Sequence, residues 1–449
     1  MMEPYTETPT KTSYWTIVTH SIIGYLGHSL MGVVDLLFCR DLGSKATATA
    51  GTGTSLFAWF MVIGIGLASA LEFFIPHAVG EKNEEKAKSY LASGALICMV
   101  LAAVATFCMY FLCNYTEALG IHPDIAVQAG QFGKILSWSY ISIYFTPFLR
   151  VELQTRGHSH DTTYAFIFSN LLNVILNWSL IYGHLGLPAL GVPGAAYASV
   201  FSRLGILIFL IVRVFQARKP LHQSLWVHSV PLKESAKAIL QMGMPISLHM
   251  LFEMGAFCFV GFLAARFEAS QNAAHTIALT IVSFTFMVPL GICSAAAQTM
   301  SRALGEKNPN EALALGQKSI RIGLYFAAAT SILYLVIRTF LMTLFTPDTE
   351  TIRIGNQLLM VVAVFQLGDA LQVILAGCLR GLGLSKIQAK VNAAGHWLVG
   401  IPVGLFLGFY LKWQILGLWV GLCVGLWTVA GGLFFWWKRS SSKLLEGRI

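Results

Sequence analysis

The sequence carries little charge and lacks the motifs of nucleotide and metal chemistry. Asp, Glu, Lys and Arg make up only 11% of its 449 residues, whereas a soluble domain has about 25%. It contains no GxxxxGK[ST] phosphate loop, no zinc-ligand spacing and no HExxH or other nucleophile–base set, which argues against an ATP-driven machine and against an intramembrane enzyme. The eight cysteines show no CxxC spacing, so we expect structural thiols rather than redox or metal sites.

Hydrophobic residues fill the chain instead, at 56% of the composition. Continuous apolar runs of about 20 residues recur along its length, and a helix of that length crosses the hydrocarbon of a bilayer. Because the runs are continuous rather than alternating, they do not fit a membrane β-barrel. The sequence therefore predicts an all-α integral membrane protein with twelve transmembrane helices, at about residues 15–38, 51–75, 90–113, 128–149, 163–183, 193–213, 241–264, 274–298, 320–343, 355–378, 391–411 and 415–437.

The net charge of +9 follows the predicted topology. With both termini in the cytoplasm, 22 of the 30 Lys and Arg residues lie on the cytoplasmic side and 7 on the opposite side, while Arg203 falls inside a span. This asymmetry is the positive-inside rule. We therefore expect a multi-pass protein of the cell inner (cytoplasmic) membrane, with both termini cytoplasmic, that contacts lipid and does not bind nucleic acid.

The two halves of the chain resemble each other. Residues 64–83 and 289–308 align without a gap, and both segments end in Gly-Glu-Lys-Asn. Arg156-Gly157 and Arg380-Gly381 form a second matching pair. Six predicted spans lie on each side of a central polar loop, so both halves begin on the same side of the membrane. The repeat predicts two six-helix lobes related by pseudo-twofold symmetry, an N-lobe at 1–225 and a C-lobe at 226–449.

Small residues recur every fourth position near the end of the chain. Such rows allow helix backbones to approach closely, and we expect the last two spans to pack through them. The residues are Gly400, Gly404 and Gly408 in one span and Gly417, Gly421 and Gly425 in the next.

Three acidic residues lie inside predicted spans. Asp35 lies near the outer end of the first span, Glu253 in the middle of the seventh and Asp369 in the middle of the tenth. An ionised carboxylate at membrane depth costs at least about 2.5–3.5 kcal/mol. Because such charges typically hold cations or protons, they indicate that the protein moves something across the membrane.

Polar residues of two other spans form a candidate site with Asp35. Asn173 and Asn177 are four residues apart, so both amides lie on one helix face, and Ser199 lies in the following span. A carboxylate, two amides and a hydroxyl make the oxygen-rich kind of site that hard cations or protons use. Two alternatives stay open at this point. Asp35 could pair with Arg40 at the outer interface, and the asparagines could serve only to hold helices together by hydrogen bonds.

Glu253 and Asp369 form a second candidate site, in the C-lobe. His249 precedes Glu253 by one helical turn, and Gln366 and Gln372 lie three residues to either side of Asp369. A carboxylate in the middle of a span has no interface within easy reach. Glu72 and Arg203, in contrast, lie in the cytoplasmic halves of their spans, and we expect them to form packing or gating pairs.

Several motifs together resemble the multidrug and toxic compound extrusion (MATE) family, in its NorM-like branch. They are VVDLLFCRDLG near the start of the chain, GEKN after spans 2 and 8, AAHTIAL at the start of span 8 and LRGLG after span 10. The similarity extends from about residue 15 to 437. It implies that Asp35, Asn173, Asn177 and Ser199 bind a cation or proton in the N-lobe, and that Glu253 and Asp369 do so in the C-lobe. Sodium is a candidate at either set, and the resemblance assigns no substrate-binding residues.

The resemblance implies a transporter rather than an enzyme. It would be a secondary active multidrug exporter, without a cofactor, that exchanges Na⁺ or H⁺ for small organic cations by alternating access and works as a monomer. The alternative is a lipid-linked oligosaccharide flippase of the wider superfamily, which would be expected to line its cavity with several Arg or Lys residues for pyrophosphate. Here the deep charges are mainly acidic, which favours cationic cargo.

One feature departs from the family. Some relatives carry a proline in the first span that is linked to a proposed bend, but this chain has none there, and His20 occupies the repeat-equivalent position of Pro245. The sequence therefore argues against a bend of the first span that depends on proline.

Overall fold

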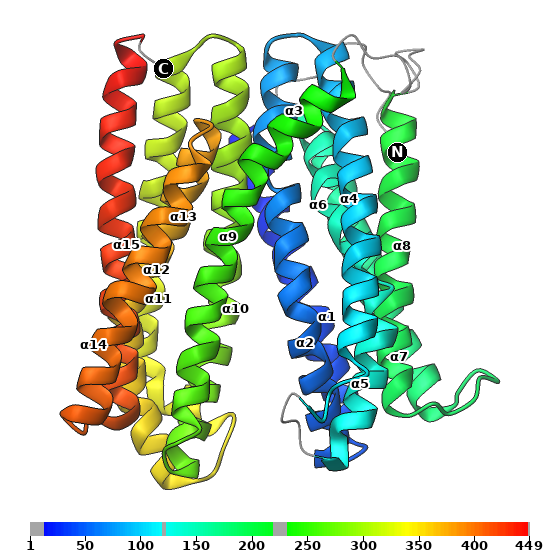
Figure 1. The fold of residues 1–449 in the computed structure, drawn as a ribbon, viewed down its shortest axis with the longest axis vertical. Helices are drawn as coiled ribbons and strands as arrows, with labels where there is room; N and C mark the ends of the chain where they lie inside the picture. Colours follow the sequence, from blue (N-terminus) through cyan, green and yellow to red (C-terminus); the bar gives the residue numbers. More distant parts are fainter. Residues whose placement is uncertain (1–12, 119–122, 219–230, 448–449) are drawn as a thin grey trace. The chain divides into compact units, whose positions relative to one another are not determined.

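The computed structural model describes residues 13–118, 123–218 and 231–447, which are mostly helical and contain no β-strand (Figure 1). This agrees with the all-α membrane fold that the apolar runs predict. The helices are α1 Tyr14–Arg40, α2 Ser44–Ala68, α3 Leu71–Gly80, α4 Glu84–Leu112, α5 Pro123–Ser137, α6 Tyr140–Thr155, α7 Ser159–Tyr182, α8 Val192–Arg218, α9 Leu232–Ala264, α10 Ala269–Gly305, α11 Pro309–Thr343, α12 Thr349–Gly381, α13 Ser385–Ala393, the π-helix η2 Ala394–Gly400, α14 Ile401–Leu405, the π-helix η3 Phe406–Tyr410, and α15 Gln414–Leu445.

The chain forms two compact units, Met1–Ser247 and Leu248–Ile449, which meet in sequence within α9. Each unit has its own interior, and we describe each by itself. The predicted boundary between the lobes, at 225/226, lies outside the described residues. The assignment of the lobes to 1–225 and 226–449 and their pseudo-twofold relation therefore stay predictions.

Eleven helices in the described part of the chain are long and apolar enough to cross a membrane. The remaining predicted span, 128–149, is divided between α5 and α6 by a turn at Trp138–Ser139. The hydroxyl groups of Ser137 and Ser139 donate to the carbonyls of Lys134 and Leu136, both at 2.7 Å. Such side-chain bonds compete with the helical ladder, and here they accompany the interruption of the apolar segment.

Helix α1 is continuous from Tyr14 to Arg40, as expected for a first span without proline. Nδ1 of His20 lies 2.6 Å from Oγ1 of Thr163 on α7, and α7 packs against both α1 and α8. These three helices carry all the residues predicted for the site in the first unit.

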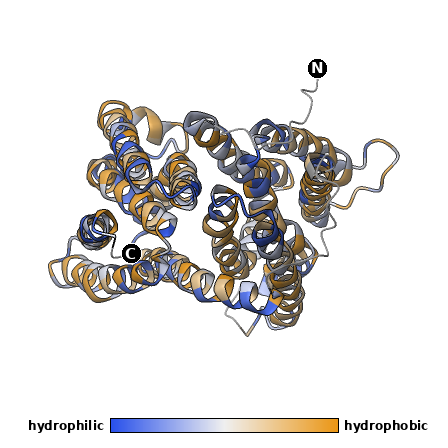
Figure 2. Ribbon diagram, turned by 90° about the horizontal axis from the view of Figure 1, so that it is seen from above, coloured by the Kyte–Doolittle hydropathy of each residue, from blue (hydrophilic) through white to orange (hydrophobic). Residues whose placement is uncertain are grey.

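Both units present apolar surfaces. Hydrophobic residues are spread over the helices of each unit (Figure 2), and several large side chains, such as Phe107, Val336 and Leu398, are about three-quarters exposed. Soluble monomers rarely expose large contiguous apolar surfaces. These apolar surfaces fit helices surrounded by lipid. All eight cysteines are free thiols.

The glycine rows at the end of the chain bring backbones into contact, as the sequence predicts. A Cβ atom on Gly421 of α15 would lie 2.3 Å from Cα of Gly404 on α14. A Cβ atom on Gly417 would lie 2.5 Å from the backbone nitrogen of Gly408 in η3. Only glycine allows these helices to approach so closely.

We expect Gly421→Ala to lower the Tm of the purified protein in detergent, because the added methyl group would push α14 and α15 apart. Overpacking of this kind typically costs about 1–3 kcal/mol. Gly431→Ala on the same helix is the matched control, since a Cβ atom there meets nothing within 4 Å. An equal fall in Tm for both variants would mean that close packing at Gly421 is not what stabilises this end of the second unit.

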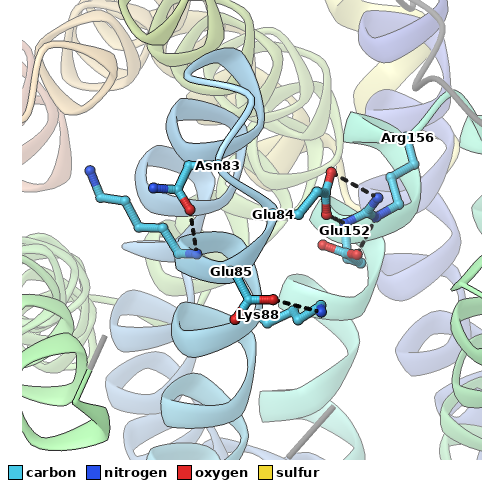
Figure 3. Close-up of polar contacts among 7 residues, drawn as sticks. Asn83, Glu84, Glu85, Lys88, Glu152 and Arg156 are labelled. Carbon is cyan, nitrogen blue, oxygen red and sulfur yellow. Dashed lines mark hydrogen bonds and ion pairs between the residues drawn. The ribbon is translucent and has the colours of Figure 1, made fainter. Parts of the chain in front are cut away.

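A buried ion-pair network joins α4 to α6 in the first unit (Figure 3). Arg156 donates from Nη2 and Nη1 to the two carboxylate oxygens of Glu84, at 2.7 and 3.3 Å, and from Nε to Glu152 one turn earlier on α6. The side chains of Arg156 and Glu152 are 5% and 1% exposed. The repeat-equivalent Arg380 donates from Nη2 to Sγ of Cys293 on α10, at 2.9 Å.

Arg156→Ala should destabilise the protein strongly, because it takes a guanidinium away from the nearly buried carboxylate of Glu152. Breaking a buried ion pair in this way typically costs about 3–5 kcal/mol. Arg353→Ala provides the control, since Arg353 also holds a carboxylate, that of Glu350, through two bonds, but its side chain is 60% exposed. Exposed pairs contribute about 0–1 kcal/mol. Thermal unfolding curves of equal Tm for the two variants would contradict a stabilising role of the Arg156 network.

Candidate cation-binding sites

The structure brings the four predicted residues of the first unit together. Asp35 on α1 is 7% exposed. Its Oδ1 accepts hydrogen bonds from Nδ2 of Asn173, at 3.1 Å, and of Asn177, at 2.8 Å, both on α7. Its Oδ2 accepts a hydrogen bond from Oγ of Ser199 on α8. The carboxylate is therefore held by three donors from two neighbouring helices.

The sequence left open two other interpretations, and the geometry bears on both. Asp35 is buried rather than directed to an interface, and no ion pair joins it to Arg40 within the described residues. Asn173 and Asn177 do link α7 to α1, since both donate to Asp35. A linking role and a role in ion binding are compatible, because the bonds to Asp35 use the Nδ2 group of each asparagine and leave its Oδ1 atom for an ion.

Acceptor groups remain available around Asp35. The side-chain oxygens of Asn173 and Asn177 are buried and have no hydrogen-bond partner in the described part of the chain. A buried acceptor without a partner calls for an explanation, and an ion is one of the usual ones. With a rotation of the amides, a carboxylate and two amide oxygens could surround a small hard cation.

The same site can hold a proton without movement of the backbone. The Ser199 hydroxyl now donates to Asp35, which suits an ionised carboxylate. Because a hydroxyl can also accept, a protonated Asp35 could donate to Ser199 while the two amide donors stay on the other oxygen. Both the ionised and the protonated carboxyl group therefore fit this arrangement.

The second unit contains the other two predicted carboxylates. Glu253 on α9 accepts a hydrogen bond from Nε2 of Gln372 on α12 at 2.5 Å, and Nε2 of His249 lies 3.7 Å from its Oε2. Asp369 on α12 is 3% exposed, and its charge interacts with that of Glu253. Because Gln372 lies about one turn after Asp369 on α12 and donates to Glu253, the two acidic residues belong to one polar region of the second unit.

Two glutamines flank Asp369 in the sequence, but their roles differ. Gln372 reaches Glu253, whereas both polar atoms of the Gln366 side chain lack a hydrogen-bond partner among the described residues. Tyr334 also interacts with the charge of Asp369, and its hydroxyl lies 2.5 Å from Oγ1 of Thr285. The sequence singled out neither Tyr334 nor Thr285, because a tyrosine or threonine in an apolar span has many structural uses.

Glu72 and Arg203 do not pair with each other. Glu72 lies 3.5 Å from Nη2 of Arg150, and both of these side chains are nearly fully buried. Arg203 is 8% exposed, and its Nη1 donates to Oγ of Ser139 at 3.0 Å. Glu72 thus has a packing partner, while Arg203 lies on α8 one turn after Ser199.

The donor sets do not resemble a transition-metal centre. No group of three or more His, Cys, Asp and Glu side chains that could hold a metal ion occurs in residues 13–118, 123–218 and 231–447. The sets around Asp35 and Glu253 consist mainly of carboxylate and amide groups, whose oxygens are ligands for hard cations.

Comparisons with known proteins match nearly the whole chain. The MatE family model matches residues 21–179 and 245–406. The chain is 27% identical to the probable multidrug resistance protein NorM of Mesorhizobium japonicum, over 93% of this chain and 91% of that protein. It is 27% identical to the multidrug resistance protein NorM of Vibrio vulnificus, over 95% and 96% of the two chains. It is 25% identical to the multidrug resistance protein MdtK of Proteus mirabilis, over 94% and 95%.

Solved structures share the fold. The crystal structure of the eukaryotic MATE transporter AtDTX14 has a TM-score of 0.85 at 23% identity and covers 97% of this chain and 98% of its own. An outward-facing multidrug resistance MATE transporter of the MOP superfamily has a TM-score of 0.88 at 21% identity, covering 99% and 100%. None of these proteins is named as a lipid flippase, so the flippase alternative gains no support.

Proposed function

This chain belongs to the MatE family, whose members are transporters rather than enzymes, and we propose that it is a secondary active multidrug exporter of the inner membrane. It exchanges inward-moving Na⁺ or H⁺ for outward-moving organic cations by alternating access, as a monomer with both termini in the cytoplasm. It uses no cofactor besides the coupling ion. The names of its NorM and MdtK relatives support multidrug efflux as the activity.

One observation carries the proposal of ion coupling. A buried carboxylate, Asp35, is held by two amides and a hydroxyl, next to two amide oxygens that lack partners. A group of this kind would be costly in a protein that only had to stay folded in lipid. It is useful when a cation or proton must bind and leave again, and the pair Glu253 and Asp369 offers a second place for the same exchange.

The free energy released by ion movement across the membrane is large enough to drive export against a substrate gradient. A tenfold substrate gradient costs about 1.4 kcal/mol, and one charge that moves through 100 mV releases about 2.3 kcal/mol. If one ion is exchanged for one monovalent cation, no net charge moves and the potential contributes nothing. Uphill export then needs either the ion gradient itself or a second ion, for which the carboxylates of the second unit would provide a place.

Export of a fluorescent organic cation from cells tests the proposed activity. Cells that express the chain should accumulate less of the dye than cells with an empty vector, and collapse of the ion gradients should remove the difference. A difference that persists without any ion gradient would rule out secondary transport. Equal accumulation of several organic cations in both strains, with the protein present in the membrane, would reject export of organic cations.

A further inference from the structure

Arg203 is a buried cation whose direct contacts do not compensate its charge. The guanidinium of this α8 residue lies 5.3 Å from the ring centroid of Phe57 on α2. It donates from Nη1 to Oγ of Ser139, whose own proton goes to the carbonyl of Leu136. Its Nε is buried and has no hydrogen-bond partner among the described residues.

A serine hydroxyl and an aromatic ring do not neutralise an arginine. Burial of an uncompensated charge is costly, and buried charges are normally paired. Within the described part of the chain, no carboxylate forms an ion pair with Arg203. Glu72, the other acidic group that the sequence associates with it, lies beside Arg150 instead.

The carboxylate that acts on Arg203 is Asp35. Arg203 follows Ser199 by four residues, so both side chains lie on the same face of α8, and Ser199 donates to Oδ2 of Asp35. The charges of Asp35 and Arg203 interact. The other titratable groups that act on these two are His28 and Cys39 on α1 and Tyr140 on α6.

We propose that Arg203 is the fixed counter-ion of the Asp35 site and competes with the coupling ion for the carboxylate. The inference rests on the proposed function, because it assumes that Asp35 binds the ion. With the site empty, the negative charge of Asp35 balances Arg203. When Na⁺ or a proton binds, it neutralises Asp35 and leaves the charge of Arg203 unbalanced. The affinity of Asp35 for the ion is therefore lower than it would be without Arg203.

Weak binding is useful to a transporter, which must release its ion in every cycle. The positive charge of Arg203 repels a bound cation over several ångströms in the protein interior. This charge is permanent, because arginine does not give up its proton at ordinary pH. The residue therefore keeps the affinity of the site low and makes release fast. Arg203 is in this sense a positioning residue: it sets the affinity of Asp35 without touching the ion.

The test compares Arg203→Gln, Arg203→Met and Arg203→Lys in the full-length protein reconstituted in lipid vesicles. We measure efflux of a fluorescent cation against Na⁺ concentration at fixed pH, and against pH without Na⁺. Without the positive charge, half-maximal efflux should occur at about tenfold lower Na⁺ concentration, or about one unit higher in pH. The maximal rate should fall, because the ion leaves more slowly. Arg203→Lys should restore the ion dependence toward that of the unaltered protein.

A second measurement does not depend on transport. Asp35→Asn leaves Arg203 without its counter-charge and should lower the Tm, whereas the double variant Asp35→Asn with Arg203→Gln should be more stable than the sum of the single effects predicts. Additive effects on the Tm, or neutral variants with unaltered ion dependence, would overturn the role of Arg203. If Asp35→Asn itself leaves the ion dependence intact, the proposed function of Asp35 fails instead.

Discussion

Asp35→Asn should reduce ion-driven efflux by about an order of magnitude or more. The change keeps the shape of the side chain but removes the charge that Asn173, Asn177 and Ser199 surround. Loss of the carboxylate removes the charge that attracts the cation, and each lost 1.4 kcal/mol of binding free energy weakens binding about tenfold. Asn173→Ala and Asn177→Ala should weaken coupling less, because each removes one neutral ligand. Efflux from vesicles with an imposed ion gradient measures all three variants.

Asp41→Asn is the matched control for this prediction. Asp41 is exposed just after the end of α1, where it accepts a hydrogen bond from the hydroxyl of Tyr182 at 2.9 Å. The variant should export normally. Normal export by Asp35→Asn, together with failure of the asparagine variants, would mean that Asp35 is not the ion ligand and that the asparagines serve another purpose.

Glu253→Gln and Asp369→Asn should each abolish or sharply reduce ion-driven efflux while membrane expression is retained. The two carboxylates belong to one polar region, and the charge of Glu253 acts on Asp369. Removal of either therefore changes both the ligand set and the charge balance of the region. In Glu253→Gln, the Nε2 group of Gln372 keeps its acceptor only if the new amide turns its oxygen toward Gln372.

Glu268→Gln is the control in the second unit, since Glu268 is exposed between α9 and α10. It should leave the efflux rate unaltered. Near-normal rates for both Glu253→Gln and Asp369→Asn would remove the pair from the coupling mechanism and leave the site around Asp35 as the candidate for ion binding.

Most of the fold could be predicted from the sequence because lipid imposes simple rules. A long apolar run has few options other than a spanning helix, and the rows that contain Gly404 and Gly421 have few uses other than close packing. The interruption at Trp138–Ser139 could not be predicted in the same way. The hydroxyls of Ser137 and Ser139 bond to the preceding turn at this point, and hydropathy does not record such local bonds.

The candidate sites were also partly predictable. Asp35, Asn173 and Asn177 could be found because polar residues in a membrane span have few explanations, and two of them share a helix face. The sequence did not indicate that the side-chain oxygens of the two asparagines lack hydrogen-bond partners, or which buried positive charge acts on Asp35. The relation of Arg203 to Asp35 depends on the packing of α8 against α1 and α7 and on the place of Ser139 at the start of α6, so it requires the structure.

The most direct test of ion-coupled export uses the purified protein in sealed vesicles, with a Na⁺ gradient alone and a pH gradient alone. At least one of the two gradients should drive a fluorescent organic cation against its own concentration gradient, and Asp35→Asn should lose most of that transport. Failure of both gradients to drive the dye through correctly inserted protein would contradict secondary active export.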